Sequence, residues 1–212
     1  ALVAYDARGL VLQVADSDEN ARISPEQERK TPDYTGYTAD TYVQHITGLM
    51  QAYTSARYPY QPLHADFAYA MRRLCERTGK DYAVAEYLMR LIIALHDLGK
   101  LNRPWQAWAA AWQAQHPMPT VPNDQPLAHT DYDYRQDRAL MERFKHPPRG
   151  PHAVESAEAA SRVILQAAGK DRSLTAAAIL AIMHHHTTTA DHCGPFEAIP
   201  QSELAIRAAL TA

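Results

Sequence analysis

The stretch Leu95-His96-Asp97-Leu98-Gly99-Lys100 constrains the fold more than any other part of the chain. It follows an apolar run over residues 88–94, and apolar side chains from Val84 and Tyr87 to Leu95 recur at spacings of three and four. This spacing predicts a buried helix that carries an imidazole and a carboxylate at its C-terminal end. Because burying either group without a partner is unfavourable, the two side chains require one, and a divalent cation is the simplest choice.

Other histidines indicate where the remaining ligands of such a cation would come from. His45 lies on the apolar stripe of an expected helix that starts with Asp40 as its N-cap. It comes three residues after Tyr42 and four before Leu49, and therefore faces inward. His64 is the alternative, although it falls at a helix start outside a clear stripe. A lone inward histidine or His-Asp pair is more often structural, but the ordered series of histidines favours a metal site.

Two more expected helices carry histidines at their ends. His152 opens the first of them. The second carries an apolar stripe which, extended by three and four residues, reaches His185 and His186. His184 is then the odd one out, although an offset of one residue at a helix end would bring it into the site instead.

These motifs together resemble the HD metallohydrolase superfamily. More narrowly, they resemble the HD nuclease domain of the CRISPR-associated helicase-nuclease of type I interference systems. The narrower resemblance rests on residues 94–100 followed by Trp105-Gln106, on residues 151–157 and on residues 181–186. It implies an all-α helical bundle around a metal site, which we place at residues 39–212. Residues 1–38 are expected to form a short β-hairpin, over residues 2–14, and a linker.

The resemblance also implies a ligand set for one or two divalent ions. The expected ligands are His45, His96, Asp97, His152, His185 and His186, with His184 and Asp191 as further candidates. Asp97 would bridge the two ions. Imidazoles with a carboxylate suit Mn, Fe, Co or Ni, and Mg remains an option. Many family members carry one more Asp in a Ser-Asp-Trp-like context, which this sequence lacks, so the last ligand stays open.

The chemistry that the resemblance implies is hydrolysis of single-stranded DNA, with Asp97 and Lys100 as catalytic residues. Lys100 would contact a phosphate oxygen, or would be a surface lysine that suits the helix dipole. Lys145, Arg149 and Trp105 are candidate substrate contacts. The expected partners are a fused or separate helicase and the CRISPR surveillance complex. The alternatives are an HD phosphohydrolase that acts on nucleotides or small phosphoesters, and a non-catalytic binding module.

Composition narrows the remaining options. A length of 212 residues with 46% hydrophobic residues fits one globular domain with an appendage. The net charge of −3 argues against a generic polyanion binder, so DNA contacts must come from a local patch, the metals or a neighbouring domain. The two cysteines lack a C-x-x-C pattern, which favours a reducing cytoplasm. No apolar run approaches the ~18 residues of a membrane span, so we expect no membrane partner.

The segment between the two histidine regions is expected to cover the site. Trp105, Trp108 and Trp112 fall on one face of a predicted helix. A packing face is the simpler interpretation, and stacking of a tryptophan on a DNA base is the functional one. Residues 117–151 predict a long loop with a short helix over residues 137–144.

Overall fold

The computed structural model describes residues 2–6, 9–13, 36–55, 63–116, 125–133, 136–147, 149–186 and 196–211. The chain divides into two compact units, Ala1–Thr35 and Gly36–Ala212. In the first unit, strand β1 (Leu2–Asp6) pairs antiparallel with β2 (Gly9–Gln13), which confirms the expected hairpin. The linker was expected over residues 15–38, of which residues 15–35 lie outside the described residues.

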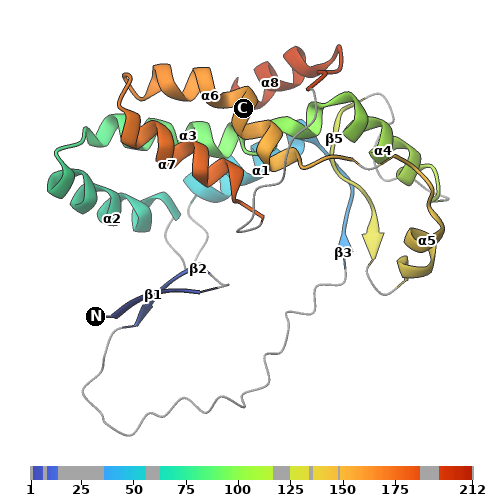
Figure 1. The fold of residues 1–212 in the computed structure, drawn as a ribbon, viewed down its shortest axis with the longest axis horizontal. Helices are drawn as coiled ribbons and strands as arrows, with labels where there is room; N and C mark the ends of the chain where they lie inside the picture. Colours follow the sequence, from blue (N-terminus) through green and yellow to red (C-terminus); the bar gives the residue numbers. More distant parts are fainter. Residues whose placement is uncertain are drawn as a thin grey trace, which may run out of the picture. The chain divides into compact units, whose positions relative to one another are not determined.

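The second unit is helical, which confirms the predicted all-α class (Figure 1). Its helices are α1 (Tyr42–Thr54), α2 (Leu63–Thr78), α3 (Tyr82–Leu95), the 3-10 helix η1 (Leu98–Leu101), α4 (Arg103–Gln113), α5 (Arg138–Arg143), α6 (His152–Ala167), α7 (Arg172–Met183) and α8 (Ser202–Thr211). In Figure 1, α2 lies at one end of this unit, and α4 with α5 at the other. No helix among the described residues is long and apolar enough to cross a membrane.

An aliphatic core holds α1, α3, α6, α7 and α8 together. Its buried side chains include Ile46 of α1, Leu91 of α3, Ile164 of α6 and Ile182 of α7. The hydroxyl of Tyr42, itself fully buried, donates a hydrogen bond of 3.1 Å to the backbone oxygen of Ala94 and so ties α1 to α3. This core fixes the three helix ends that carry the histidines.

A second, aromatic cluster lies beside the first. Trp105, Trp108 and Trp112 are buried there, and Leu127 packs with them, which agrees with the packing interpretation of the tryptophans. Short strands flank the cluster, in segments for which the sequence predicts a loop, a linker or, at Asp40, a helix cap. Strand β3 (Gly36–Tyr37) pairs with β6 (Tyr132–Asp133), and β4 (Asp40–Thr41) pairs with β5 (Leu127–His129).

Two local expectations were wrong. Asp40 does not cap α1; the N-cap is the next residue, Thr41, whose hydroxyl accepts a hydrogen bond from the Gln44 backbone N–H in a capping box. Tyr87 does not face the core of α3 but is 54% exposed. The short helix expected over residues 137–144 is present as α5.

Candidate metal centre

Asp97 lies at the centre of the site, in the turn between α3 and η1. Its position follows from the apolar stripe of α3, which buries the C-terminal end of that helix, and its side chain is only 2% exposed. A carboxylate at this depth is stable only when hydrogen-bond donors or cations surround it. The neighbours of its two oxygens therefore define what the site can bind.

The first oxygen, Oδ2, faces two imidazoles and an ammonium group. It lies 3.1 Å from Nε2 of His45, 3.3 Å from Nε2 of His96 and 2.8 Å from Nζ of Lys100. Nδ1 of His96 lies 2.9 Å from the backbone oxygen of Ile93, which can only accept, so Nδ1 donates. In the neutral ring, Nε2 of His96 then directs a lone pair at the carboxylate. A cation between the two atoms would turn this repulsive contact into a favourable one.

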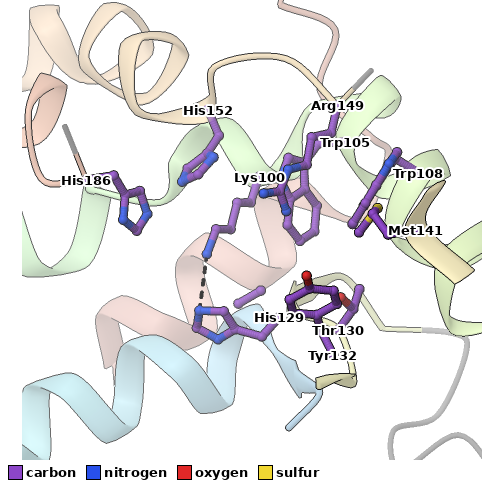
Figure 2. Close-up of a pocket in the computed structure, with 11 residues that line it drawn as sticks. Lys100, Trp105, Trp108, His129, Thr130, Tyr132, Met141, Arg149, His152 and His186 are labelled. Atoms are coloured by element: carbon purple, nitrogen blue, oxygen red, sulfur yellow. Dashed lines mark hydrogen bonds between the residues drawn. The ribbon is translucent and has the colours of Figure 1, made fainter. Parts of the chain in front are cut away.

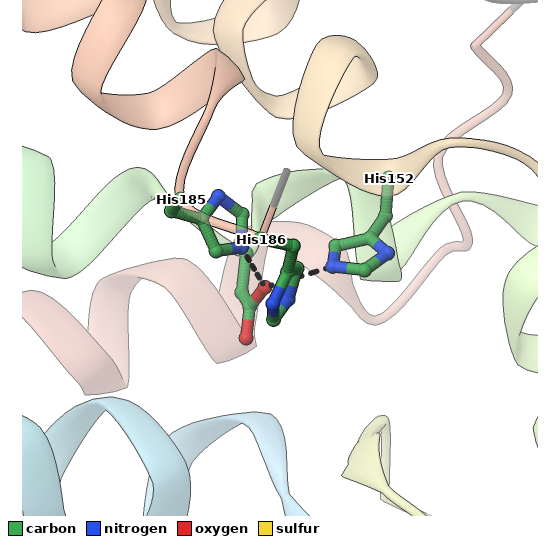
Figure 3. Close-up of side chains that lie close together, drawn as sticks. His152, His185 and His186 are labelled. Carbon is green, nitrogen blue, oxygen red and sulfur yellow. Dashed lines mark ion pairs between the residues drawn. The ribbon is translucent and has the colours of Figure 1, made fainter. Parts of the chain in front are cut away.

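The second oxygen, Oδ1, faces two histidines from α6 and from the segment after α7; Figure 3 shows these two rings beside that of His186. It lies 3.4 Å from Nε2 of His152, at the start of α6, and 3.4 Å from Nε2 of His185, just beyond α7. Nδ1 of His185 donates to the backbone oxygen of Ile182 over 2.6 Å, which leaves the Nε2 lone pair facing Asp97. The His186 ring lies 4.0 Å from that of His185, centroid to centroid, and completes a group of potential ligand atoms within 4.8 Å of one another.

Three polar atoms in this second group have no hydrogen-bond partner among the described residues. They are Oδ1 of Asp97 and Nε2 of His152 and of His185, and all three are buried. Buried polar atoms are almost always hydrogen-bonded, so three unpaired ones that converge need an explanation. Their chemistry, one carboxylate oxygen and two imidazole nitrogens, suits a divalent transition metal. The residues present therefore fit the metal that an HD site implies.

The surroundings of these side chains keep them in the protonation states that bind a cation. Burial alone would raise the pKa of Asp97, but the surrounding imidazoles, that of His185 first, and the charge of Lys100 hold it well below its usual value. Burial lowers the pKa of His152 to about 3 and that of His186 to about 4, so both are neutral near pH 7. The site thus offers an ionised carboxylate and, at His152 and His186, neutral imidazoles, which are the forms that bind metal.

Close packing of η1 on α6 brings His152 to Asp97. A Cβ atom on Gly99 would lie 2.1 Å from the backbone oxygen of His152, so only glycine fits. The backbone N–H of Gly99 donates to Oγ of Ser156 over 2.7 Å, and that hydroxyl donates to the same backbone oxygen over 2.7 Å. Gly99 therefore permits a close approach between two helices, rather than the sharp helix exit that its place in the sequence indicates.

The structure brings some of the predicted ligands together and leaves others out. Those that converge around Asp97 are His45, His96, His152, His185 and His186. His184 is the C-cap of α7 and belongs to none of the groups of potential ligands in the described part of the chain. His64 lies apart from them, with Nδ1 3.2 Å from the backbone oxygen of Tyr53. Asp191 lies outside the described residues.

A pocket of about 400 Å³ adjoins the metal ligands (Figure 2). Its wall includes Lys100, Arg149, Trp105 and Trp108, and the guanidinium of Arg149 lies 4.7 Å from the centre of the Trp108 ring. Lys100 is 3% exposed, so the alternative of a surface lysine is wrong. Trp105 is 1% exposed and offers little ring face to a base, and Lys145 is exposed but is not among the residues that line the pocket.

Sequence reasoning missed two polar residues beside this centre, Asp40 and His129. Nδ1 of His129 lies 2.9 Å from Oδ1 of Asp40, and Nδ1 of His45 lies 3.5 Å from Oδ2. Burial would raise the pKa of Asp40, but these two histidines lower it to about 2. The pairing of β4 with β5 creates this contact, and strands of two and three residues carry no readable periodicity.

Comparison with known proteins identifies the family. The family model described as "Cas3, HD domain" matches residues 59–206, which is most of the chain. No curated protein and no solved structure matched. The match begins after His45, so the place of that residue in the site rests on its 3.1 Å contact with Asp97. Because the match spans the His-Asp element, α6 and the histidines after α7, the chain belongs to the family of Cas3 HD domains.

Proposed function

We propose that this protein is a metal-dependent nuclease that cleaves single-stranded DNA in type I CRISPR interference. Membership of the Cas3 HD family supports a CRISPR-associated nuclease. The observation that carries the metal-dependent step is the convergence of three unpaired, buried atoms of Asp97, His152 and His185. A metal-dependent phosphodiester hydrolase needs such a cation-binding cluster, whereas a packing module gains nothing from it.

Two groups of ligands around Asp97 support a site for one or two ions. His45, His96 and Asp97 would hold one ion, and Asp97 with His152, His185 and His186 would hold the second. The donor set favours Mn, Fe, Co or Ni, and Mg is the remaining candidate. When bound, such ions act as Lewis acids and make water nucleophilic near neutral pH.

The chain's own cations would bind and orient the DNA backbone. Nζ of Lys100 lies 2.8 Å from Asp97 and also lines the pocket, so it can donate to a phosphate oxygen that enters there. Arg149 lies at the same pocket, and exposed Lys145 lies four residues before it in the chain. We assign the backbone contacts to these three residues. Stacking of a base on Trp105 stays an untested prediction, and the burial of that ring counts against it.

The low net charge bears on how DNA reaches the site. A chain with a net charge of −3 does not attract the polyanion DNA over long distances. We therefore propose that a fused or separate helicase delivers the strand, that the CRISPR surveillance complex recruits both, and that they act in the cytoplasm.

Cleavage of circular single-stranded DNA tests this function. With Mn²⁺, the wild-type chain should open the circle, chelation should stop the reaction, and Asp97→Ala should reduce it to background while the helical circular dichroism spectrum is retained. Hydrolysis of deoxynucleotides without opening of the circle would instead support a small-molecule phosphohydrolase. Normal cleavage by Asp97→Ala would show that the site is assigned wrongly.

A further inference from the structure

Asp40 and His129 form a second polar cluster that touches the metal centre from the side of the short strands. They lie opposite each other in the β4–β5 pair, and Oδ1 of Asp40 accepts a hydrogen bond from Nδ1 of His129 over 2.9 Å. The other oxygen, Oδ2, lies 3.5 Å from Nδ1 of His45. One carboxylate therefore faces the Nδ1 atoms of two different histidines.

The contact with His45 determines which nitrogen of that ring is available to a cation. An ionised carboxylate only accepts hydrogen bonds, so it favours the proton on Nδ1 of His45. Nε2, at the other side of the ring, is then the lone-pair atom, and it lies 3.1 Å from Oδ2 of Asp97. Carboxylates that hold a metal-binding histidine in this way fix its tautomer and its orientation.

The contact with His129 acts on Lys100 by the same reasoning. With its proton on Nδ1, His129 presents the Nε2 lone pair, which lies 3.4 Å from Nζ of Lys100 (Figure 2). That ammonium group lies 2.8 Å from Oδ2 of Asp97. Contacts thus run from Asp40 through His45 to Asp97, and back from Asp97 through Lys100 and His129.

We propose that Asp40 is a positioning residue of the metal centre. It holds His45 with Nε2 toward the cation, and through His129 it holds the ammonium group of Lys100 beside Asp97. The proposal rests on the proposed function in one respect, since it requires that the cluster around Asp97 binds a divalent ion.

A direct role for Asp40 as a ligand fits the geometry less well. Asp40, His45 and His129 do offer three potential ligand atoms within 4.8 Å of one another. However, an ion held there by Nδ1 of His45 would compete for that ring with an ion held at Nε2 beside Asp97. The 2.9 Å contact between Asp40 and His129 also has the length of an ordinary hydrogen bond.

Titration of the metal-free chain with Co²⁺ tests the proposal, with affinity and visible absorption as readouts. Asp40→Ala should weaken Co²⁺ binding by about 10–100-fold without changing the number of ions bound. Asp40→Asn keeps the size of the side chain but presents a single acceptor, so it should also weaken binding, and it decides the test if Asp40→Ala does not fold. His129→Ala removes the contacts of that ring to Lys100 and to Asp40 but keeps the contact of Asp40 with His45, so it should lower kcat for DNA cleavage while Co²⁺ affinity stays within a few-fold of wild type.

Two results would overturn the proposal. One is a folded Asp40 variant that binds Co²⁺ as tightly as wild type. The other is the loss of one whole ion from Asp40→Ala with unchanged affinity for the rest, which would make Asp40 a ligand. A wild-type chain that binds no Co²⁺ would refute the proposed function as well, so the two failures are distinguishable.

Discussion

The buried carboxylate of Asp97 and the half-buried carboxylate of Asp171 differ in how their oxygens are hydrogen-bonded. Asp171 caps α7: its Oδ1 accepts hydrogen bonds from the backbone N–H groups of Ser173 and Leu174, and its Oδ2 accepts one from Nζ of Lys80 over 2.6 Å. Asp97 is more deeply buried, yet its Oδ1 has no hydrogen-bond partner among the described residues.

This difference separates a structural carboxylate from one that is held ready for a ligand. Both have a pKa below the usual value, but for different reasons. Hydrogen bonds from Lys80 and from the cap lower the pKa of Asp171, so local contacts stabilise its charge completely. At Asp97, imidazoles and Lys100 outweigh burial and still leave one oxygen unpaired. The depressed pKa alone therefore does not identify the functional residue, whereas an unpaired buried oxygen that faces the unpaired nitrogens of His152 and His185 does.

The largest difference in metal affinity is expected between variants of two adjacent histidines, His185 and His184. His185→Ala removes an imidazole 3.4 Å from Asp97 and should weaken binding of Mn²⁺ by at least about 10–100-fold. His184→Ala, one residue earlier at the C-cap of α7, should change that affinity only a few-fold. Isothermal titration of the metal-free proteins measures both, and the reverse order would move the site to His184.

A methyl group at Gly99 should disturb the centre through the backbone. Because its Cβ would lie 2.1 Å from the backbone oxygen of His152, Gly99→Ala should lower the free energy of unfolding by about 1–3 kcal/mol and weaken metal binding. Gly48→Ala is the control: it lies within α1 with nothing within 4 Å of its added Cβ, so it should stabilise the protein by about 0.5–1 kcal/mol. Urea unfolding measures both, and equal stabilities would contradict the close approach.

Acid should destabilise the metal-free protein below about pH 6.5. Burial lowers the pKa of His152 to about 3 and that of His186 to about 4, while both protonate near 6.5 in the unfolded chain. The unfolded chain therefore binds more protons below pH 6.5, and the free energy of unfolding decreases as the pH is lowered. Burial also lowers the pKa of His45, but Asp40 and Asp97 outweigh it and raise the net value. The contribution of His45 is lost only as pH rises through its folded-state pKa, so below 6.5 it is fully present and does not offset the loss.

The pH effect is measured by urea unfolding in a chelator between about pH 7 and pH 4.5. His152→Asn should flatten the dependence of stability on pH, because it removes one of the two buried neutral imidazoles. A dependence as steep as that of wild type would contradict the burial of His152 in a neutral form.

The smallest effects on metal binding are expected from replacing Asp171, whose two oxygens both accept hydrogen bonds. Asp171→Asn retains a good N-cap and removes only the ion pair with Lys80, so it should leave the melting temperature nearly unchanged. Asp171→Ala removes the cap as well and should lower the melting temperature by a few degrees. Neither should alter metal affinity, and a loss of affinity in the Asn variant would break the contrast with Asp97.

Helical periodicity explains why much of the metal centre can be predicted from the sequence. The apolar stripes of α1, α3 and α7 predict that His45, His96 and His185 face the core, and the structure brings these three histidines together around Asp97. The resemblance to HD nucleases supplied the joint assignment of these residues. Asp97 at the end of α3 follows from the apolar run alone.

The remainder depends on contacts that no local pattern encodes. Asp40 resembles a helix cap in the sequence, but pairing of β4 with β5 turns it toward His45 and His129. The packing of α8 against α1, through buried Ala205 and Ala209, likewise follows from tertiary structure rather than from a motif.

The most direct test of the account is the number of Mn²⁺ ions that each chain retains at equilibrium dialysis, measured by mass spectrometry for wild type and Asp97→Asn. The variant keeps the size of the side chain but removes the charge on which the imidazoles converge. We expect wild type to hold one or two ions and Asp97→Asn to lose them while remaining helical. Equal occupancy in the two proteins, or none in folded wild type, would contradict the account.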